Sequence, residues 1–95
     1  MVVETSYPWK NADSWGKKKN MAWPISPAGQ KKFMADLIDT VRQTPDGRGV
    51  GVVYWHPESV PGKGPGGRAW NSGAMALFDD KGNALAAVDA LAASR

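Results

Sequence analysis

The sequence contains no cysteine and a single histidine, His56. The absence of cysteine excludes disulfides and thiolate zinc sites, and one histidine leaves no histidine-based metal cluster within one chain. No apolar run approaches the about 20 residues that are needed to span a bilayer. A strand is predicted directly after Met1, which leaves no room for a signal peptide. We therefore expect no membrane partner, and either a cytoplasmic protein or a piece of something longer.

Basic residues are only in small excess, with a formal net charge of +3 over 95 residues. Three consecutive lysines, Lys17–Lys19, lie together in one predicted loop. Nucleic-acid recognition would instead require basic residues spread along a face with aromatic residues between them, so we predict no nucleic-acid partner. The hydrophobic content of 42% is ordinary for a folded protein, and the length predicts one small domain over residues 1–95.

The first residues form a short β-branched run that carries a carboxylate. This run predicts a strand over residues 2–5, with Glu4 near its C-terminal end. A long loop is predicted to follow over residues 8–25. In parallel sheets and β/α barrels, functional sites are built at the C-terminal ends of strands. Five tryptophans in so short a chain indicate a stacking surface, with core filling as the alternative for two or three of them.

A helix and a second strand are predicted next. Ser26 and Pro27 are typical of an N-cap and a first helical residue, and Thr44–Gly47 form the turn that ends the helix. Residues 49–55 lack polar alternation, so we expect a strand buried on both faces, as parallel strands are. The apolar stripe of the predicted helix consists of Phe33, Met34, Leu37, Ile38 and Val41.

The last third begins with a second long loop, residues 59–73, which includes Trp70. Residues 74–78 are a short apolar piece, either a helical turn or an extended segment, and a turn follows over residues 79–82. Asn83 is expected to cap a last helix that runs through Ala93. The order β-α-β-α, with long loops after the strands, predicts an α/β fold of the β/α-barrel or doubly wound type. Two parallel strands cannot cover their own edges, so the unit is incomplete or is completed by self-association.

Four motifs, in order along the chain, carry a resemblance to a known family. They are Val3-Glu4-Thr5-Ser6-Tyr7-Pro8-Trp9, Pro27-x-Gly29-Gln30, Gly51-Val52-Val53-Tyr54-Trp55-x-Pro57 and Ala76-Leu77-Phe78-Asp79. The chain resembles glycoside hydrolase family 53, the arabinogalactan endo-β-1,4-galactanases, which are retaining enzymes with a TIM (β/α)8 barrel and are usually secreted. The resemblance implies that residues 2–5 and 50–55 are the seventh and eighth strands. Each would be followed by its helix in a single (β/α)2 unit.

The resemblance also implies a site and a substrate, β-galactan or a related polysaccharide. Glu4 falls on the catalytic nucleophile of the family, and Trp55 falls on the aromatic floor beneath the sugar. Further substrate-binding candidates are His56 and Glu58 at the second strand end, and the tryptophans Trp9, Trp15, Trp23 and Trp70.

We expect no cofactor. The resemblance to the family makes calcium binding in the barrel loops conceivable for Asp13, Asp79 and Asp80, but their spacing does not form a loop of the calcium-binding type.

Two departures from the family leave alternatives open. Many members have glutamate where this chain has His56, and the acid/base glutamate lies at the end of the fourth strand, which this chain does not contain. A retaining mechanism needs two carboxyl groups about 5–5.5 Å apart, and only Glu4 has a motif behind it. Three hypotheses follow: a glycosidase completed by self-association, in which four copies would supply eight strands, a non-catalytic carbohydrate-binding fragment, or an inert truncated remnant.

Overall fold

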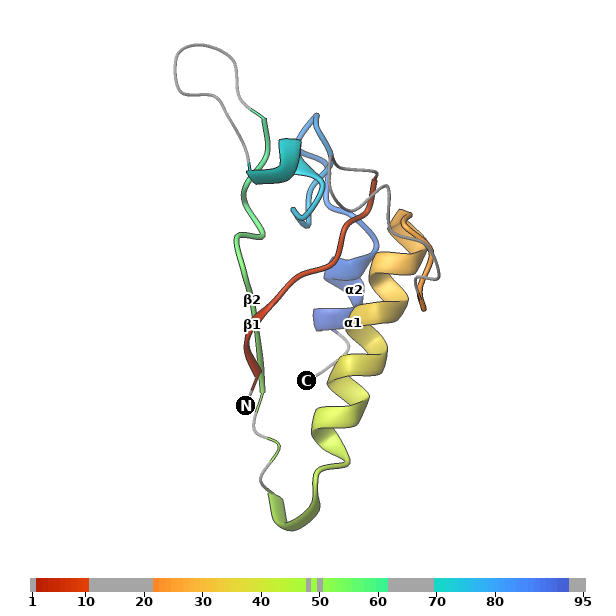
Figure 1. Cartoon of the computed structure of the whole chain (residues 1–95), viewed down its shortest axis with the longest axis vertical. Helices are drawn as coiled ribbons and strands as arrows, with labels where there is room; N and C mark the ends of the chain where they lie inside the picture. The colour runs from red at the N-terminus through yellow and green to blue at the C-terminus, as the bar shows by residue number, and fades with distance from the viewer. Residues whose placement is uncertain (1, 11–21, 48, 50, 62–69, 93–95) are drawn as a thin grey trace.

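The computed structural model describes residues 2–10, 22–47, 49, 51–61 and 70–92. Two strands, β1 and β2, pair in parallel, and the helices α1 and α2 both lie on one side of this sheet (Figure 1). No helix within the described ranges is both long enough and apolar enough to cross a membrane. In chain order the elements are β1 (Val2–Thr5), α1 (Pro27–Arg42), the 3-10 turn η1 (Pro45–Gly47), β2 (Val52–Tyr54), the 3-10 turn η2 (Trp70–Gly73) and α2 (Ala87–Ala92).

The helix α1 begins and ends where local sequence signals place it. The Ser26 hydroxyl accepts a hydrogen bond from the Gly29 N–H at 2.9 Å, and Pro27 is the first helical residue. Both features satisfy or remove amide donors that have no partner inside the first turn. The apolar stripe turns inward, with Met34 completely buried at its centre. The predicted helix is therefore confirmed.

The core lies between the sheet and the two helices. Met34 of α1, Leu77, and Ala87 and Ala90 of α2 form the buried cluster. Tyr54, together with Val52 of the same strand, packs against it from the sheet side. Small alanines on α2 allow this short helix to approach α1 closely, so the core is thin but continuous.

The apolar segment Ala74–Leu77 is a buried connector rather than a helix or a strand. All four residues are buried, and the Leu77 N–H donates to the Pro57 carbonyl at 2.9 Å. Directly after it, Phe78 forms an isolated antiparallel bridge with Ala84. This connector follows η2 near the C-terminal ends of the strands, and the turn closed by the Phe78–Ala84 bridge leads from it to α2 (Figure 1).

Three details of the sequence prediction are wrong. The strand β2 covers residues 52–54 rather than 49–55, and Val53 is 47% exposed, because the helices of the described part of the chain cover one face of the sheet. The helix α2 begins at Ala87 rather than after Asn83. Asn83 instead closes a turn: its carbonyl accepts from the Asp79 N–H at 2.8 Å, and its own N–H donates to the Asp79 carboxylate at 2.9 Å.

An aromatic cluster fixes the loop after β1 against the start of α1. Tyr7 stacks on Phe33 with ring centroids 4.7 Å apart, and Trp23 meets both rings edge-on. The Tyr7 hydroxyl donates to the Trp23 carbonyl, and the Trp23 indole N–H donates to the Asp36 carboxylate at 2.8 Å. Trp23 therefore packs against Tyr7 and Phe33 while it stays partly exposed, and its role in sugar stacking stays a prediction.

Acid is expected to weaken this cluster. The Trp23 indole first, and Lys32 second, hold the pKa of Asp36 below its ordinary value of 3.8. A carboxyl with a lowered pKa in the folded state contributes stability above its ordinary pKa and loses it as the pH falls through the folded value. We expect the urea midpoint to drop between about pH 5 and pH 2, and Asp36→Asn to flatten this dependence.

A control variant on the same helix is Asp39→Asn. In the unmodified chain the Asp39 carboxylate accepts a hydrogen bond from the Gln43 side chain at 2.8 Å. Urea titrations at several pH values, followed by circular dichroism, would compare the three proteins. Equal acid sensitivity of the unmodified chain and Asp36→Asn would contradict the assigned role of Asp36.

Candidate functional site

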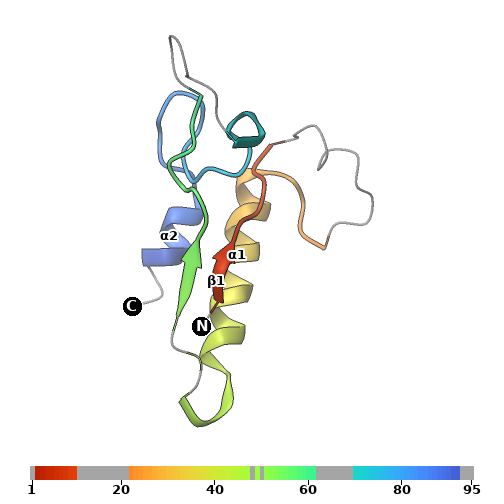
Figure 2. The ribbon, with the colours of Figure 1, turned by 60° about the vertical axis from the view of Figure 1, so that its left-hand side comes forward.

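Glu4 and Trp55 lie at the same edge of the sheet. Because β1 and β2 are parallel, their C-terminal ends meet at one edge, with Thr5 paired to Tyr54 (Figure 2). The Trp55 N–H donates to the Thr5 carbonyl at 2.8 Å, one residue beyond Glu4. The expectation that both strand ends contribute to one edge is thus confirmed.

Glu4 and Trp55 are both exposed beside this edge of the sheet. Tyr54 packs against the core on the helix side, so its neighbour Val53 within β2 points away from the helices, since successive strand residues alternate. Trp55 directly follows β2, and the pairing of the two strands is irregular between the first and last residues of β1. Val53 and Trp55 are 47% and 42% exposed. Glu4 is exposed while Thr5 beside it is buried. Glu4, Val53 and Trp55 form what we call the open face. In a closed β/α barrel the face turned away from the helices is the barrel interior.

His56 and Glu58 pair with one another at the end of β2. The His56 Nδ1 atom lies 3.2 Å from the Glu58 carboxylate, and its ring meets the edge of Trp55 with centroids 4.6 Å apart. His56 adopts a left-handed backbone conformation, φ 53°, which turns the chain sharply after the strand. This turn places the two polar side chains beside Trp55.

Glu58 is suited to staying ionised. Its own backbone N–H first, and the His56 side chain second, hold the pKa of this carboxyl below its ordinary value. A general acid must keep a proton at working pH, which requires a raised pKa instead. Glu58 can therefore accept hydrogen bonds from a ligand but is poorly suited to protonate a leaving group.

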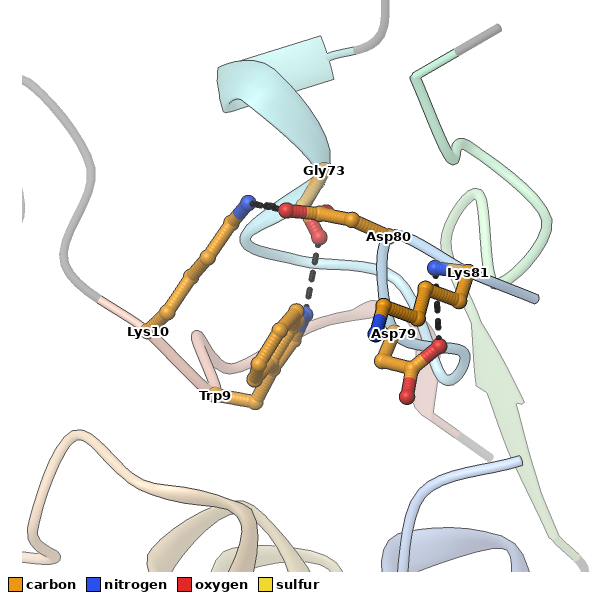
Figure 3. Close-up of polar contacts among 6 residues, drawn as sticks. All are labelled: Trp9, Lys10, Gly73, Asp79, Asp80 and Lys81. Atoms are coloured by element: carbon orange, nitrogen blue, oxygen red, sulfur yellow. Dashed lines mark hydrogen bonds and ion pairs between the residues drawn. The ribbon is translucent and has the colours of Figure 1, made fainter. Parts of the chain in front are cut away.

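Trp9 joins the loop after β1 to the segment after β2 (Figure 3). Its indole N–H donates to the Gly73 carbonyl and its backbone N–H donates to the Ala74 carbonyl, both at 2.9 Å. The Lys10 ammonium lies 5.2 Å from the centroid of the Trp9 ring and forms an ion pair with Asp80 at 2.6 Å. These contacts occupy the Trp9 N–H and bring a cation over the ring, so its role as a sugar platform stays a prediction.

Two of the three acidic residues considered for calcium, Asp79 and Asp80, have other partners. The Asp79 carboxylate accepts from the backbone N–H groups of Asn83 and Lys81, each at 2.9 Å, and these bonds, with that from the Asn83 side chain, lower its pKa. Asp80 pairs with Lys10, as Figure 3 shows. Asp13 and Trp15 lie outside the described residues, as does the side chain of Trp70. Within the described ranges, no three acidic or histidine side chains are grouped closely enough to hold a metal ion.

Sequence reasoning missed Gln30 and Tyr54, which hold the two strand ends together. Gln30 is completely buried, and its side-chain amide donates to the carbonyls of Tyr7 and Ala76, both at 2.9 Å. A signal for Gln30 was present in the sequence. It precedes Met34 by four residues and therefore occupies the buried stripe of α1, where a polar residue needs buried partners.

The parallel β-α-β-α order, with Glu4 and Trp55 at the C-terminal edge of the sheet, fits a fragment of a β/α barrel. The family model of Glycosyl hydrolase family 53 matches residues 1–91. The chain belongs to this family of glycoside hydrolases. Its fold is a partial TIM barrel, and the galactanase-type resemblance seen in the motifs is confirmed at the level of the family.

Two curated relatives and one solved structure are similar to this chain. An uncharacterized protein in the bgaB 5′ region of Niallia circulans is 35% identical over 97% of the chain and 28% of its own length. An arabinogalactan endo-β-1,4-galactanase of Cellvibrio japonicus is 37% identical over 63% of the chain and 17% of its own length. The Ignisphaera aggregans GH53 catalytic domain superposes with a TM-score of 0.73 at 27% identity, covering 94% of the chain and 28% of that domain. The chain thus spans less than a third of each protein.

Proposed function

We propose that this chain supplies the nucleophile and part of the sugar platform of a site that hydrolyses β-1,4-galactan. The observation that carries the proposal is the placement of Glu4 and Trp55, both exposed, at one edge of the sheet. In this proposal residues 2–5 and 50–55 are the seventh and eighth strands of a barrel, each with its following helix. The galactanase relative from Cellvibrio japonicus supports the substrate class.

The Glu4 carboxylate would attack the anomeric carbon of a bound galactosyl unit. One C–O bond forms to Glu4 and the glycosidic C–O bond breaks, while an acid protonates the leaving oxygen. Water then hydrolyses the glycosyl ester and restores the free carboxylate. Trp55 would stack on the apolar face of the sugar, and Glu58 would accept hydrogen bonds from its hydroxyl groups. Its own backbone N–H and the His56 side chain hold the pKa of Glu58 below its ordinary value, so we assign the acid to another carboxyl group.

The acid would come from a second carboxyl group brought by self-association. Four copies would supply eight strands, cover the open face and place several Glu4 side chains around one cavity. The exposed Val53 and Trp55 support this part of the proposal, because apolar side chains on a sheet face are stabilised by cover. Sedimentation of the purified chain tests it, and a monomer at every concentration would exclude assembly.

A second candidate is a carbohydrate-binding fragment without catalysis. The observation that favours it is the pairing of Glu58 with His56 beside Trp55, at 3.2 Å, which suits Glu58 to accept hydrogen bonds from a ligand. In this case Trp55 would still stack on a sugar, and Glu4 would act only as a hydrogen-bond acceptor.

The deciding experiment measures hydrolysis and binding on the same sample. Reducing-sugar release from β-1,4-galactan reports catalysis, and a tryptophan fluorescence titration with galacto-oligosaccharides reports binding, with a β-1,4-glucan as the control polysaccharide. Galactan-selective release supports the hydrolase. Selective binding without release supports the binding fragment. If the chain shows neither hydrolysis nor binding, both proposals are overturned and the inert remnant is left.

A further inference from the structure

A single buried amide joins the segments that follow both strands. The Gln30 side-chain nitrogen donates to the Tyr7 carbonyl, beyond β1, and to the Ala76 carbonyl in the buried connector, both at 2.9 Å. The same nitrogen lies 3.3 Å from the hydroxyl of Tyr54, the last residue of β2. Gln30 has no exposed surface, so water does not compete for these hydrogen bonds.

The Tyr54 hydroxyl completes the network. It donates to the Met75 carbonyl at 2.7 Å and accepts from the Tyr7 N–H at 3.1 Å. Each of the two Gln30 N–H bonds and the Tyr54 O–H bond has a carbonyl acceptor, and the members are all neutral. Among the described residues, the Gln30 side-chain oxygen is a buried polar atom without a hydrogen-bond partner. The donors of the network are all satisfied, and displacing any of them would leave a further buried polar group without a partner, which favours one arrangement.

This network is linked through the backbone to Glu4 and Trp55. Tyr54 directly precedes Trp55, whose N–H donates to the Thr5 carbonyl at 2.8 Å, and Thr5 directly follows Glu4. Tyr7 approaches from the other side, three residues after Glu4. A displacement of the Tyr54 hydroxyl would therefore move both strand ends. Catalytic geometry is sensitive to such movement, since a misplacement of about 1 Å costs on the order of 10²-fold in rate.

We propose that Gln30 and Tyr54 are positioning residues that fix Glu4 relative to Trp55, an inference that rests on the proposed hydrolytic function. Neither residue lies on the open face, because Gln30 is buried in α1 and Tyr54 packs toward the core. They act through the backbone of the two strand ends rather than through contact with substrate.

The test compares Tyr54→Phe with Tyr7→Phe in the full chain. Each substitution removes one phenol hydroxyl from the interior, but the Tyr7 hydroxyl bonds to the Trp23 carbonyl, outside the network. The substitution Gln30→Met removes both amide donors at similar length. If that variant fails to fold, Tyr54→Phe still decides. The readouts are the amide hydrogen exchange rate of Trp55 by NMR, and kcat and KM on galactan.

We expect Trp55 amide exchange to be about fivefold faster in Tyr54→Phe than in Tyr7→Phe, the factor that one buried hydrogen bond predicts. We also expect kcat to fall about tenfold in Tyr54→Phe with KM nearly unchanged, since misplacement affects the reacting geometry more than binding. Equal Trp55 exchange in the two variants would overturn the proposal. Absence of hydrolysis in the unmodified chain would count against the proposed function alone, because the exchange comparison does not need activity.

Discussion

Glu4→Gln is expected to abolish galactan hydrolysis by the chain while leaving galactan binding nearly unchanged. Glutamine keeps the size and hydrogen-bonding reach of the side chain but cannot form the glycosyl ester. Removing a covalent nucleophile costs on the order of 10³-fold or more in kcat in enzymes of this kind. Because Glu4 is exposed, the substitution should leave the free energy of unfolding almost unchanged. Reducing-sugar release and fluorescence binding titrations measure the two effects separately.

A matched control removes a carboxylate from the far end of the molecule. Asp46 lies in η1, between α1 and β2, at the opposite end of the strands from Glu4 (Figure 1). Its backbone is left-handed, φ 63°, and asparagine tolerates this conformation well, so Asp46→Asn should fold and keep full activity.

A 2-fluoro-galactoside that accumulates the intermediate should label Glu4, which mass spectrometry would detect. Full hydrolysis by Glu4→Gln would remove Glu4 from the mechanism.

Gly29→Ala is expected to unfold the chain or destabilise it severely. An added Cβ at this position would lie 1.7 Å from the Pro24 carbonyl oxygen, a backbone atom that cannot move without displacing the start of α1. In an open helix position, alanine instead of glycine is stabilising by about 0.5–1 kcal/mol. Here the clash should reverse the sign and cost on the order of 3 kcal/mol or more, a large share of the stability of a small domain. Urea unfolding followed by circular dichroism would measure it.

Gly51→Ala provides the control, because an added Cβ there meets no atom within 4 Å. It lies just before β2, and we expect an unchanged or slightly higher urea midpoint, by at most about 1 kcal/mol. Equal midpoints for Gly29→Ala and Gly51→Ala would show that the Pro24 backbone yields easily and would contradict the close packing at the start of α1.

Short-range patterns in the sequence predicted the α/β fold and a two-stranded sheet that cannot cover its own edges. Ser26 and Pro27 set the start of α1 because capping acts within one turn, and the structure confirms the predicted helix. The order of strands and helices predicted a parallel sheet, and a parallel sheet necessarily brings Glu4 and Trp55 to one edge. The family followed from four motifs whose order and spacing are properties of the sequence alone.

Other features depended on contacts between distant segments, which no local pattern encodes. Asn83 has the residue type of an N-cap, yet its bonds to Asp79 hold it in a turn, and α2 begins at Ala87. The apolar run around Val53 predicts burial on both faces, but burial depends on the layers around a strand. Among the described residues, helices cover one face of the sheet, and Val53 lies exposed on the other.

The sequence by itself determined the helix α1, the parallel order of the strands, the family, and the residues of the strand ends, because these follow from local propensity and from motif spacing. Only the tertiary structure decided how these ends are held. Gln30 acquires its partners from residues 23 and 46 positions away, Tyr7 and Ala76. A hydrogen-bond network of this kind exists only once the strands, α1 and the buried connector have packed together, because its donors and acceptors come from separate segments.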